Sequence, residues 1–208
     1  MKRILCYGDS NTWGHDPITK DRFDDKTRWT RVLGQALGPD YEVIEEGLNG
    51  RTTVWDDPLE GYKNGREYLV PCLETHRPVD LVIIMLGTND LKKRFSVSAG
   101  DIAQGVGVLV SIVQRSTVGR QGKAPLILIL VPPPTSTLTE YAEAFDDAEN
   151  KSRKFATFYR RVAQEMGCDY LDTSTVVVTS PVDGIHFEAG EHRKLGNAVA
   201  IKVKELVG

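Results

Sequence analysis

A serine, a histidine and an aspartate in this sequence could together form a nucleophilic site. Ser10 follows a short apolar run within the segment GDSN, and Asp183 and His186 are three residues apart near the C-terminus. A serine hydroxyl is a weak nucleophile at neutral pH, so it needs a base within hydrogen-bond reach and a third group that orients the base. Imidazole exchanges protons near neutral pH and suits the role of the base. We therefore expect Ser10 to be the nucleophile, His186 its base and Asp183 the residue that orients the imidazole.

Each of these segments is a weak signal when taken alone. Gly, Asp, Ser and Asn also form ordinary turns and helix caps, and a histidine followed by an apolar residue is often a packed, hydrogen-bonded ring. Two more polar segments, 47–52 (GLNGRT) and 87–90 (GTND), likewise follow apolar runs. The specific signal is that all four segments occur in this order, each after an expected strand.

Five short apolar runs predict the strands that would position these segments. The runs 80–86 and 126–131 are almost continuously apolar, which is typical of strands covered on both faces in a parallel sheet. With three others, they give expected strands at 3–7, 41–46, 80–86, 126–131 and 168–171. Between and after them lie segments with helical character at 29–37, 65–76, 98–117, 149–166 and 189–207.

The alternation of strands and helices predicts an α/β protein with a three-layer sandwich around a doubly wound, five-stranded parallel sheet, flavodoxin-like in architecture. We expect one domain over residues 1–208, because the chain suits one sizeable core. In such sheets, ligands bind beyond the carboxyl ends of the strands. The four polar segments should therefore gather at one edge.

Composition excludes several classes of protein. The formal net charge of -3 gives no broad basic footprint, so no nucleic-acid partner is expected. No apolar stretch has the length of a signal-peptide core or a membrane helix, so we expect a soluble cytoplasmic protein without a membrane partner. The three cysteines are far apart and lack metal-ligand spacing, so we expect them to be reduced and buried. The acidic positions near His15 and Asp57 lack ligand spacing too, and we interpret them as solvated loop.

Across essentially its whole length, the sequence resembles the SGNH (GDSL-type) hydrolases. The matching blocks are 8–10 (GDS), Gly50, 87–90 (GTND) and the pair Asp183 and His186. The segments 12–14 (TWG), 45–48 (EEGL), 51–53 (RTT) and 182–187 (VDGIHF) are similar to those of bacterial arylesterases and acyltransferases within the family.

The resemblance implies an oxyanion hole formed by the backbone N–H groups of Ser10 and Gly50 and the side-chain amide of Asn89. A glycine at position 50 leaves room for the oxyanion, and an asparagine offers a donor without a competing negative charge. Asp9, beside the nucleophile, is interpreted as a cap of backbone amides rather than a second catalytic acid.

The expected substrate pocket contains Trp13, Asn11 and Phe187, with Trp55 and the proline run 132–134 as further candidate walls. Asn11 stands where many family members have leucine, and His15 stands where close relatives have a second tryptophan. The resemblance therefore implies a less apolar pocket in this chain.

These observations predict a serine esterase that hydrolyses short-chain acyl and aryl esters through an acyl-enzyme, with acyl transfer to an alcohol as a second outcome. The small-molecule ester and a water or alcohol acceptor are the expected partners, and neither a cofactor nor a metal is expected. Relatives self-associate around the site mouth, which implies a homo-oligomer formed through 51–66 and 132–147. Two alternatives stay open: a carbohydrate acetyl esterase, lysophospholipase or thioesterase, and a non-catalytic phosphate- or nucleotide-binding module, against which the usual phosphate loops are missing.

Overall fold

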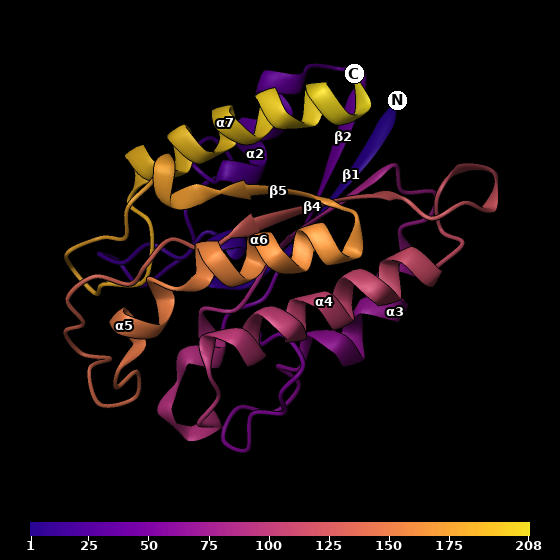
Figure 1. Ribbon diagram of the computed structural model, residues 1–208. Coiled ribbons are helices and arrows are strands. Elements are labelled where there is room, and N and C mark those ends of the chain that lie inside the picture. The colour runs from indigo at the N-terminus through magenta and orange to yellow at the C-terminus, as the bar shows by residue number, and fades with distance from the viewer.

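The computed structural model describes residues 1–208 and contains one five-stranded sheet (Figure 1). All pairings are parallel, and the spatial order of the strands is β2-β1-β3-β4-β5. The strands are β1 (Lys2–Gly8), β2 (Tyr41–Gly47), β3 (Leu81–Met85), β4 (Leu126–Val131) and β5 (Asp169–Asp172). The predicted doubly wound parallel sheet is therefore confirmed.

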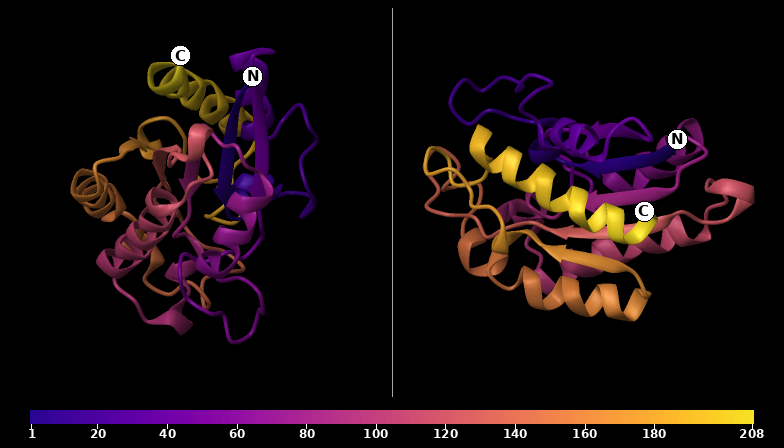
Figure 2. Two further views of the ribbon diagram at one scale, coloured as in Figure 1. Left: turned by 90° about the vertical axis from the view of Figure 1, so that its right-hand side faces the viewer. Right: turned by 90° about the horizontal axis from the view of Figure 1, so that it is seen from above.

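Helices cover both faces of this sheet, as the views in Figures 1 and 2 show. One layer contains α2 (Trp29–Leu37) and α7 (Ala189–Val207), and the opposite layer contains α3 (Gly65–Thr75), α4 (Ala99–Arg115) and α6 (Phe155–Met166). Two apolar clusters fill the space between the sheet and these layers. Every side chain of β3 is buried, which explains why its sequence is apolar without alternation.

Local sequence signals explain where several helices begin and end. Ser98 and Asp101 form a capping box at the start of α4, in which each side chain bonds the backbone N–H of the other. Gly167 ends α6 in the left-handed conformation, where glycine carries no steric penalty. The helix α3 runs through Pro71 and ends one residue before the predicted boundary.

Two helical regions differ from the prediction. The four-residue helix α1 (Ser10–Trp13) directly follows β1 where only a polar turn segment was expected. The expected helix 149–166 is two helices, α5 (Ala148–Ser152) and α6, separated by Arg153 and Lys154. Short 3-10 turns complete the elements at Asn89–Leu91, Lys93–Phe95, Arg120–Gly122 and Thr173–Thr175.

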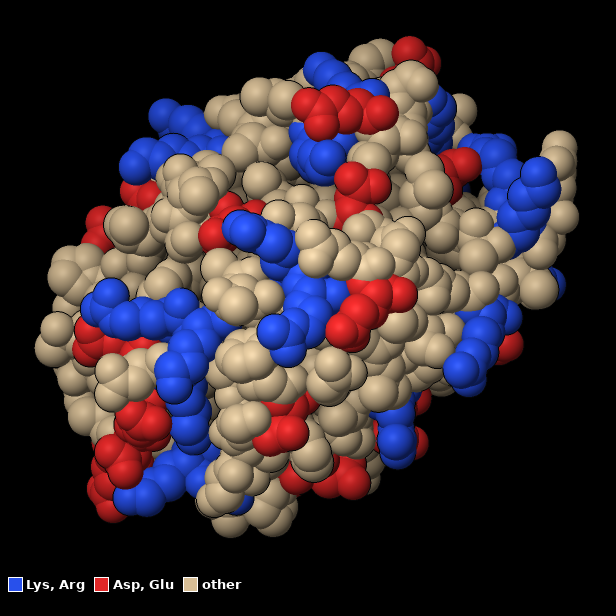
Figure 3. All heavy atoms as spheres, in the orientation of Figure 1, with Lys and Arg blue, Asp and Glu red and all other residues tan.

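The surface carries both signs of charge. On the face shown in Figure 3, basic and acidic side chains are interspersed over the helices and loops. None of the helices has the length and apolar character that crossing a membrane requires. The three cysteines are free; Cys6 and Cys72 are buried, whereas Cys168 is half-buried.

Candidate active site

The sheet brings the polar segments together at one edge. Because β1, β2 and β3 run parallel, the segments that follow Gly8, Gly47 and Met85 leave the sheet on the same side. Side-chain bonds then tie these segments to one another. Arg51 Nη1 donates to Gly8 O at 2.9 Å, and Thr53 N donates to the Asp90 carboxylate at 3.0 Å. This cross-bracing holds the strand-end loops in fixed relation to one another.

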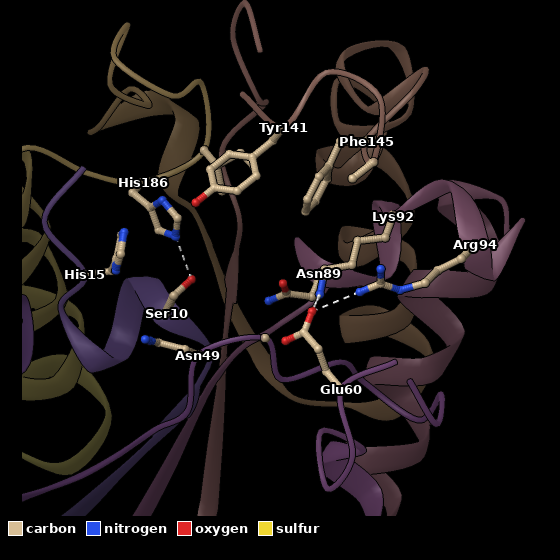
Figure 4. Close-up of a pocket in the computed structure, with 13 residues that line it drawn as sticks. Ser10, His15, Asn49, Glu60, Asn89, Lys92, Arg94, Tyr141, Phe145 and His186 are labelled. Carbon is tan, nitrogen blue, oxygen red and sulfur yellow. Dashed lines mark hydrogen bonds and ion pairs between the residues drawn. The ribbon is translucent and has the colours of Figure 1, made fainter. Parts of the chain in front are cut away.

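Ser10, His186 and Asp183 form a hydrogen-bonded series at this edge (Figure 4 shows the first two). The Ser10 Oγ to His186 Nε2 distance is 2.9 Å, and the His186 Nδ1 to Asp183 Oδ2 distance is 2.7 Å. A carboxylate can only accept, so Nδ1 carries the imidazole proton. Nε2 is then the acceptor for the hydroxyl of Ser10. The structure thus brings together three side chains, and Ser10 and His186 are 176 positions apart in the sequence.

The Asp183 carboxylate is buried and held in its ionised form. Its Oδ1 accepts from the backbone N–H groups of Ile185 and His186, both at 2.9 Å. Burial alone would raise the pKa of Asp183, but the hydrogen bonds and charge of His186 and the Ile185 amide lower it to about 2. The negative charge that orients the imidazole is therefore present throughout the neutral range.

Ser10 is the first residue of α1, and Asp9 caps that helix as expected. Asp9 Oδ1 accepts from the backbone N–H of Asn11 at 3.0 Å, while Oδ2 is buried without a partner. Burial raises the pKa of Asp9 to about 6, against the lowering effects of this hydrogen bond and of nearby positive charge. The cap fixes the turn that presents the Ser10 hydroxyl to His186.

The two other expected oxyanion donors line the same cavity as Ser10. Gly50 has a φ of 80°, a conformation that strongly favours glycine. Asn89 Nδ2 donates one hydrogen to Arg51 O at 3.1 Å, which leaves its second N–H free for another acceptor. Gly87, at the start of this segment, has a φ of 125°, and a Cβ there would collide with the Tyr159 hydroxyl. The glycine is therefore required for the chain to reach Asn89.

A cavity of about 390 Å³ opens beside these groups. Of its 13 lining residues only four are hydrophobic, and several of the others can donate or accept hydrogen bonds. The lining residues are Ser10, His15, Asn49, Gly50, Glu60, Asn89, Lys92, Arg94, Tyr141, Ala144, Phe145, Ile185 and His186. This volume suits a small ligand.

The structure does not place the expected substrate-binding side chains in this cavity. Phe187 is fully buried between the sheet and the α2–α7 layer, where it packs edge-on against His192. Asn11 is buried and donates to Ile185 O at 3.3 Å, and Trp13 lies outside the lining under the Arg22 guanidinium. Trp55 and the prolines at 132–134 are not among the lining residues either. The expected substrate-binding residues and the residues that line this cavity therefore do not overlap, because neighbours of a site residue can face the core.

Residues that were not among the expected substrate-binding residues line the cavity or support its wall. His15 had two interpretations from the sequence, a solvated loop residue and a replacement for a tryptophan of the pocket; its ring lies 4.2 Å from the His186 ring and its Nε2 is buried without a partner, which favours the second. Burial, then the charge of His186, lowers the pKa of His15. Tyr141 and Phe145 come from the long segment after β4. Asp57, also interpreted as solvated, is buried against cations from the segment after β3.

Two groups of side chains bring three potential metal-ligand atoms within 4.8 Å of one another. One contains His15, Asp183 and His186, and the other contains Glu46, Cys72 and His76. In each group a histidine already bonds a carboxylate, His186 to Asp183 and His76 Nε2 to Glu46 at 2.7 Å. In each group, one histidine and one carboxylate are therefore already engaged with each other.

A parallel α/β sandwich with serine, histidine and aspartate hydrogen-bonded in series at its carboxyl edge is typical of serine hydrolases. The profile of the GDSL-like Lipase/Acylhydrolase family matches residues 6–193, and the chain belongs to this family of ester-cleaving enzymes. The resemblance inferred from the sequence is thereby confirmed.

Solved structures similar to this one have the same fold over the full chain. An aryl esterase of M. smegmatis is 45% identical with a TM-score of 0.96, and the match covers 100% of both chains. A carbohydrate acetylesterase from Sinorhizobium meliloti is 38% identical with a TM-score of 0.96, covering 99% of this chain and 100% of that one. A lipase/acylhydrolase from Enterococcus faecalis, at 15% identity and a TM-score of 0.70, shares the fold. No curated protein sequence matches the chain.

Proposed function

We propose that this protein is a serine esterase that hydrolyses short-chain acyl and aryl esters through an acyl-enzyme on Ser10. The observation that carries the proposal is the continuous hydrogen-bonded series from Ser10 Oγ through His186 to the Asp183 carboxylate. The 45% identity to an aryl esterase supports the choice of substrate class.

In the proposed first half-reaction, Ser10 Oγ attacks the ester carbonyl while His186 Nε2 takes the hydroxyl proton. The imidazolium that forms is stabilised by Asp183, which stays ionised because its pKa is about 2. His186 then donates the proton to the leaving alcohol. The product of this step is an ester between the acyl group and Ser10.

The negative charge on the carbonyl oxygen would be held by three donors. These are the backbone N–H groups of Ser10 and Gly50 and the free side-chain N–H of Asn89, all of which belong to residues lining the cavity. Losing one such donor costs roughly 100- to 1000-fold in rate in enzymes that use them. Asn89 is held in place by its hydrogen bond to Arg51 O, so its side chain needs little reorganisation during the reaction.

The second half-reaction needs an acceptor that His186 can deprotonate. Water completes hydrolysis, and an alcohol bound in the same cavity would complete an acyl transfer by the same steps. Both outcomes follow from one acyl-enzyme, and their ratio depends on how the cavity partitions water and alcohol.

Release of 4-nitrophenol from 4-nitrophenyl acetate by the purified protein tests this function. We expect turnover in the wild type and its loss in Ser10→Ala, because no other hydroxyl is bonded to His186. Ser174→Ala, which alters an exposed serine bonded to Asp172, is a matched control and should retain turnover. An intact ester with wild-type protein, or full activity in Ser10→Ala, would contradict the proposal. If the wild-type protein left the ester intact and nucleotides raised its melting temperature, the alternative of a nucleotide-binding module would be favoured.

A second candidate is deacetylation of carbohydrates. It is favoured by the hydrogen-bonding side chains Asn49, Glu60 and Asn89 in the cavity lining and by 38% identity to a carbohydrate acetylesterase. A comparison of kcat/KM for glucose pentaacetate and 4-nitrophenyl acetate distinguishes the two candidates. A clear preference for the sugar acetate would place the natural substrate among acylated carbohydrates.

Self-association through the loops at 51–66 and 132–147 stays a prediction. The first of these loops carries two exposed apolar side chains, Leu59 and Tyr62, which suit such a contact. Sedimentation velocity on the wild type and on Tyr62→Ser measures it directly, and a monomeric wild type would contradict it.

A further inference from the structure

One wall of the cavity, beyond Asn89, is lined by two cations and one carboxylate, and a second carboxylate is buried behind them. The esterase mechanism uses none of these four groups. Lys92 Nζ lies 2.8 Å from Glu60 Oε1 and 3.4 Å from Asp57 Oδ2. Arg94 Nη2 lies 2.9 Å from Glu60 Oε1 and 2.7 Å from Asp57 Oδ2. Figure 4 shows the Glu60 carboxylate below the ends of both cations, and Glu60 is one of the residues that line the cavity.

The two carboxylates have different surroundings. The side chain of Asp57 is fully buried, and its Oδ1 also accepts from the backbone N–H groups of Leu59 and Glu60 at 2.9 and 3.2 Å. Asp57 is therefore a fixed part of the wall. The side chain of Glu60 is 42% exposed, and its carboxylate is hydrogen-bonded to the side chains of Lys92 and Arg94. Its carboxylate can leave by rotation of an exposed side chain.

The charges of the wall balance only when Glu60 is included. Lys92 and Arg94 contribute two positive charges, and Asp57 neutralises one of them. The Lys92 side chain is only 8% exposed, so the remaining charge is poorly solvated and favours a bound anion. Without Glu60, the wall would present one net positive charge and a set of free N–H donors to the cavity.

The direction of the reaction decides which part of a substrate would reach this wall. His186 must protonate the leaving alcohol, so the alcohol lies on the His186 side of Ser10. Figure 4 shows His186 at one end of the cavity and Lys92 and Arg94 at the other, with Asn89 between. An acyl chain that extends away from the leaving group would then run past Asn89 toward the cations.

We propose that Lys92 and Arg94 form a subsite for a carboxylate at the far end of the acyl chain, and that Glu60 occupies this subsite in the free protein. The preferred substrates would then be monoesters of dicarboxylic acids. The substrate carboxylate replaces that of Glu60 and accepts the same hydrogen bonds, so no charge is left unpaired. A singly charged carboxylate fits because the wall has one unbalanced positive charge. This inference rests on the proposed esterase function.

Matched pairs of esters test the subsite. In each pair the leaving group is 4-nitrophenol and the acyl chain ends in either a carboxylate or a methyl group: hydrogen adipate against hexanoate, and hydrogen suberate against octanoate. The quantity compared is the ratio of kcat/KM for the anionic ester to kcat/KM for the neutral ester, after subtraction of spontaneous cleavage. Two chain lengths are used because the reach from Ser10 to the cations determines which one fits.

Glu60→Gln should raise this ratio several-fold, because it removes the internal competitor while keeping the size of the side chain. Arg94→Gln, made in the Glu60→Gln background so that the internal carboxylate cannot compensate, should lower the ratio by roughly tenfold to a hundredfold, as expected for a charge-assisted hydrogen bond. Arg153→Gln is the matched control, because Arg153 pairs with Glu149 on the surface outside the cavity. It should leave the ratio unchanged.

A ratio that is the same in all variants, with the neutral esters still hydrolysed, would overturn the subsite and leave the esterase function standing. A wild-type protein that cleaves none of the four esters and does not cleave 4-nitrophenyl acetate would overturn both proposals. Thermal unfolding of each variant confirms that it is folded before the ratios are compared.

Discussion

Replacement of Asp183 by asparagine tests how the site controls the protonation of His186. Asp183 Oδ1 accepts two backbone N–H groups, so the oxygen of an asparagine at this position must occupy the Oδ1 site. The NH₂ group then faces His186 Nδ1 where a carboxylate oxygen lies now. Nδ1 would have to accept, and the imidazole proton would move to Nε2. In that tautomer His186 cannot take the proton of Ser10.

Two contributions set the size of the effect. An asparagine carries no charge, so the carboxylate's stabilisation of the imidazolium is lost; the lowering of the Asp183 pKa from 3.8 to about 2 corresponds to roughly 2.5 kcal/mol, which His186 shares with the backbone amide of Ile185. The wrong tautomer adds to this loss, and the same substitution in a serine protease triad lowers kcat by roughly 10⁴-fold. We therefore expect kcat for 4-nitrophenyl acetate to fall by roughly 10³- to 10⁴-fold.

Steady-state kinetics on Asp183→Asn, with thermal unfolding to verify the fold, provides the measurement. Asp172→Asn is a suitable control, since Asp172 also accepts a backbone N–H two residues on but lies at the end of β5 outside the cavity. It should retain wild-type kcat. A folded Asp183→Asn protein with kcat within tenfold of wild type would refute the assigned role of the carboxylate and the tautomer argument with it.

Two further predictions concern neighbouring residues. Asn89→Ala removes one proposed oxyanion donor, so kcat should fall by roughly 100- to 1000-fold while the protein stays folded; a loss smaller than threefold would exclude Asn89 as a donor. Asp9 has a pKa raised to about 6 by burial, so its favourable contribution to stability is complete below about pH 4 and is lost as the pH rises through 6. The free energy of unfolding of Asp9→Asn, relative to wild type, should therefore increase by up to roughly 3 kcal/mol between pH 4 and pH 7 in urea titrations. A difference that is independent of pH would contradict the buried, proton-binding state of Asp9.

The helices and strands that could be predicted from sequence are those whose burial leaves a clear pattern of apolar residues. The strands β3 and β4 were evident because buried parallel strands are continuously apolar. The helix α1 was missed because four residues are too few to show a helical period. The break between α5 and α6 at Arg153 and Lys154 contains neither glycine nor proline, so nothing in the sequence marks it.

Among the site residues, the hydrogen-bonded series could be predicted from the sequence, whereas the pocket wall could not. The arrangement of Ser10, Asp183 and His186 followed from their types and their positions after apolar runs. The pocket wall did not, because it depends on which face of the chain each side chain takes. His186 faces the cavity while the next residue, Phe187, lies in the core. Asp57 resembles a solvated aspartate until the fold brings Arg94, 37 positions away, against it.

The ends of the chain lie next to each other, far from the catalytic serine. Lys2 Nζ donates to Val207 O, and Figures 1 and 2 show the two termini side by side. Ser10 is separated from the N-terminus by the seven residues of β1, roughly 20 Å, and His186 from the C-terminus by the 19 residues of α7, roughly 28 Å. An immobilising tether at either terminus would therefore hold the molecule with its cavity turned outward to the bulk solution. A short peptide linking the two ends would give a circular chain, which could be reopened at a surface loop without disturbing the catalytic edge.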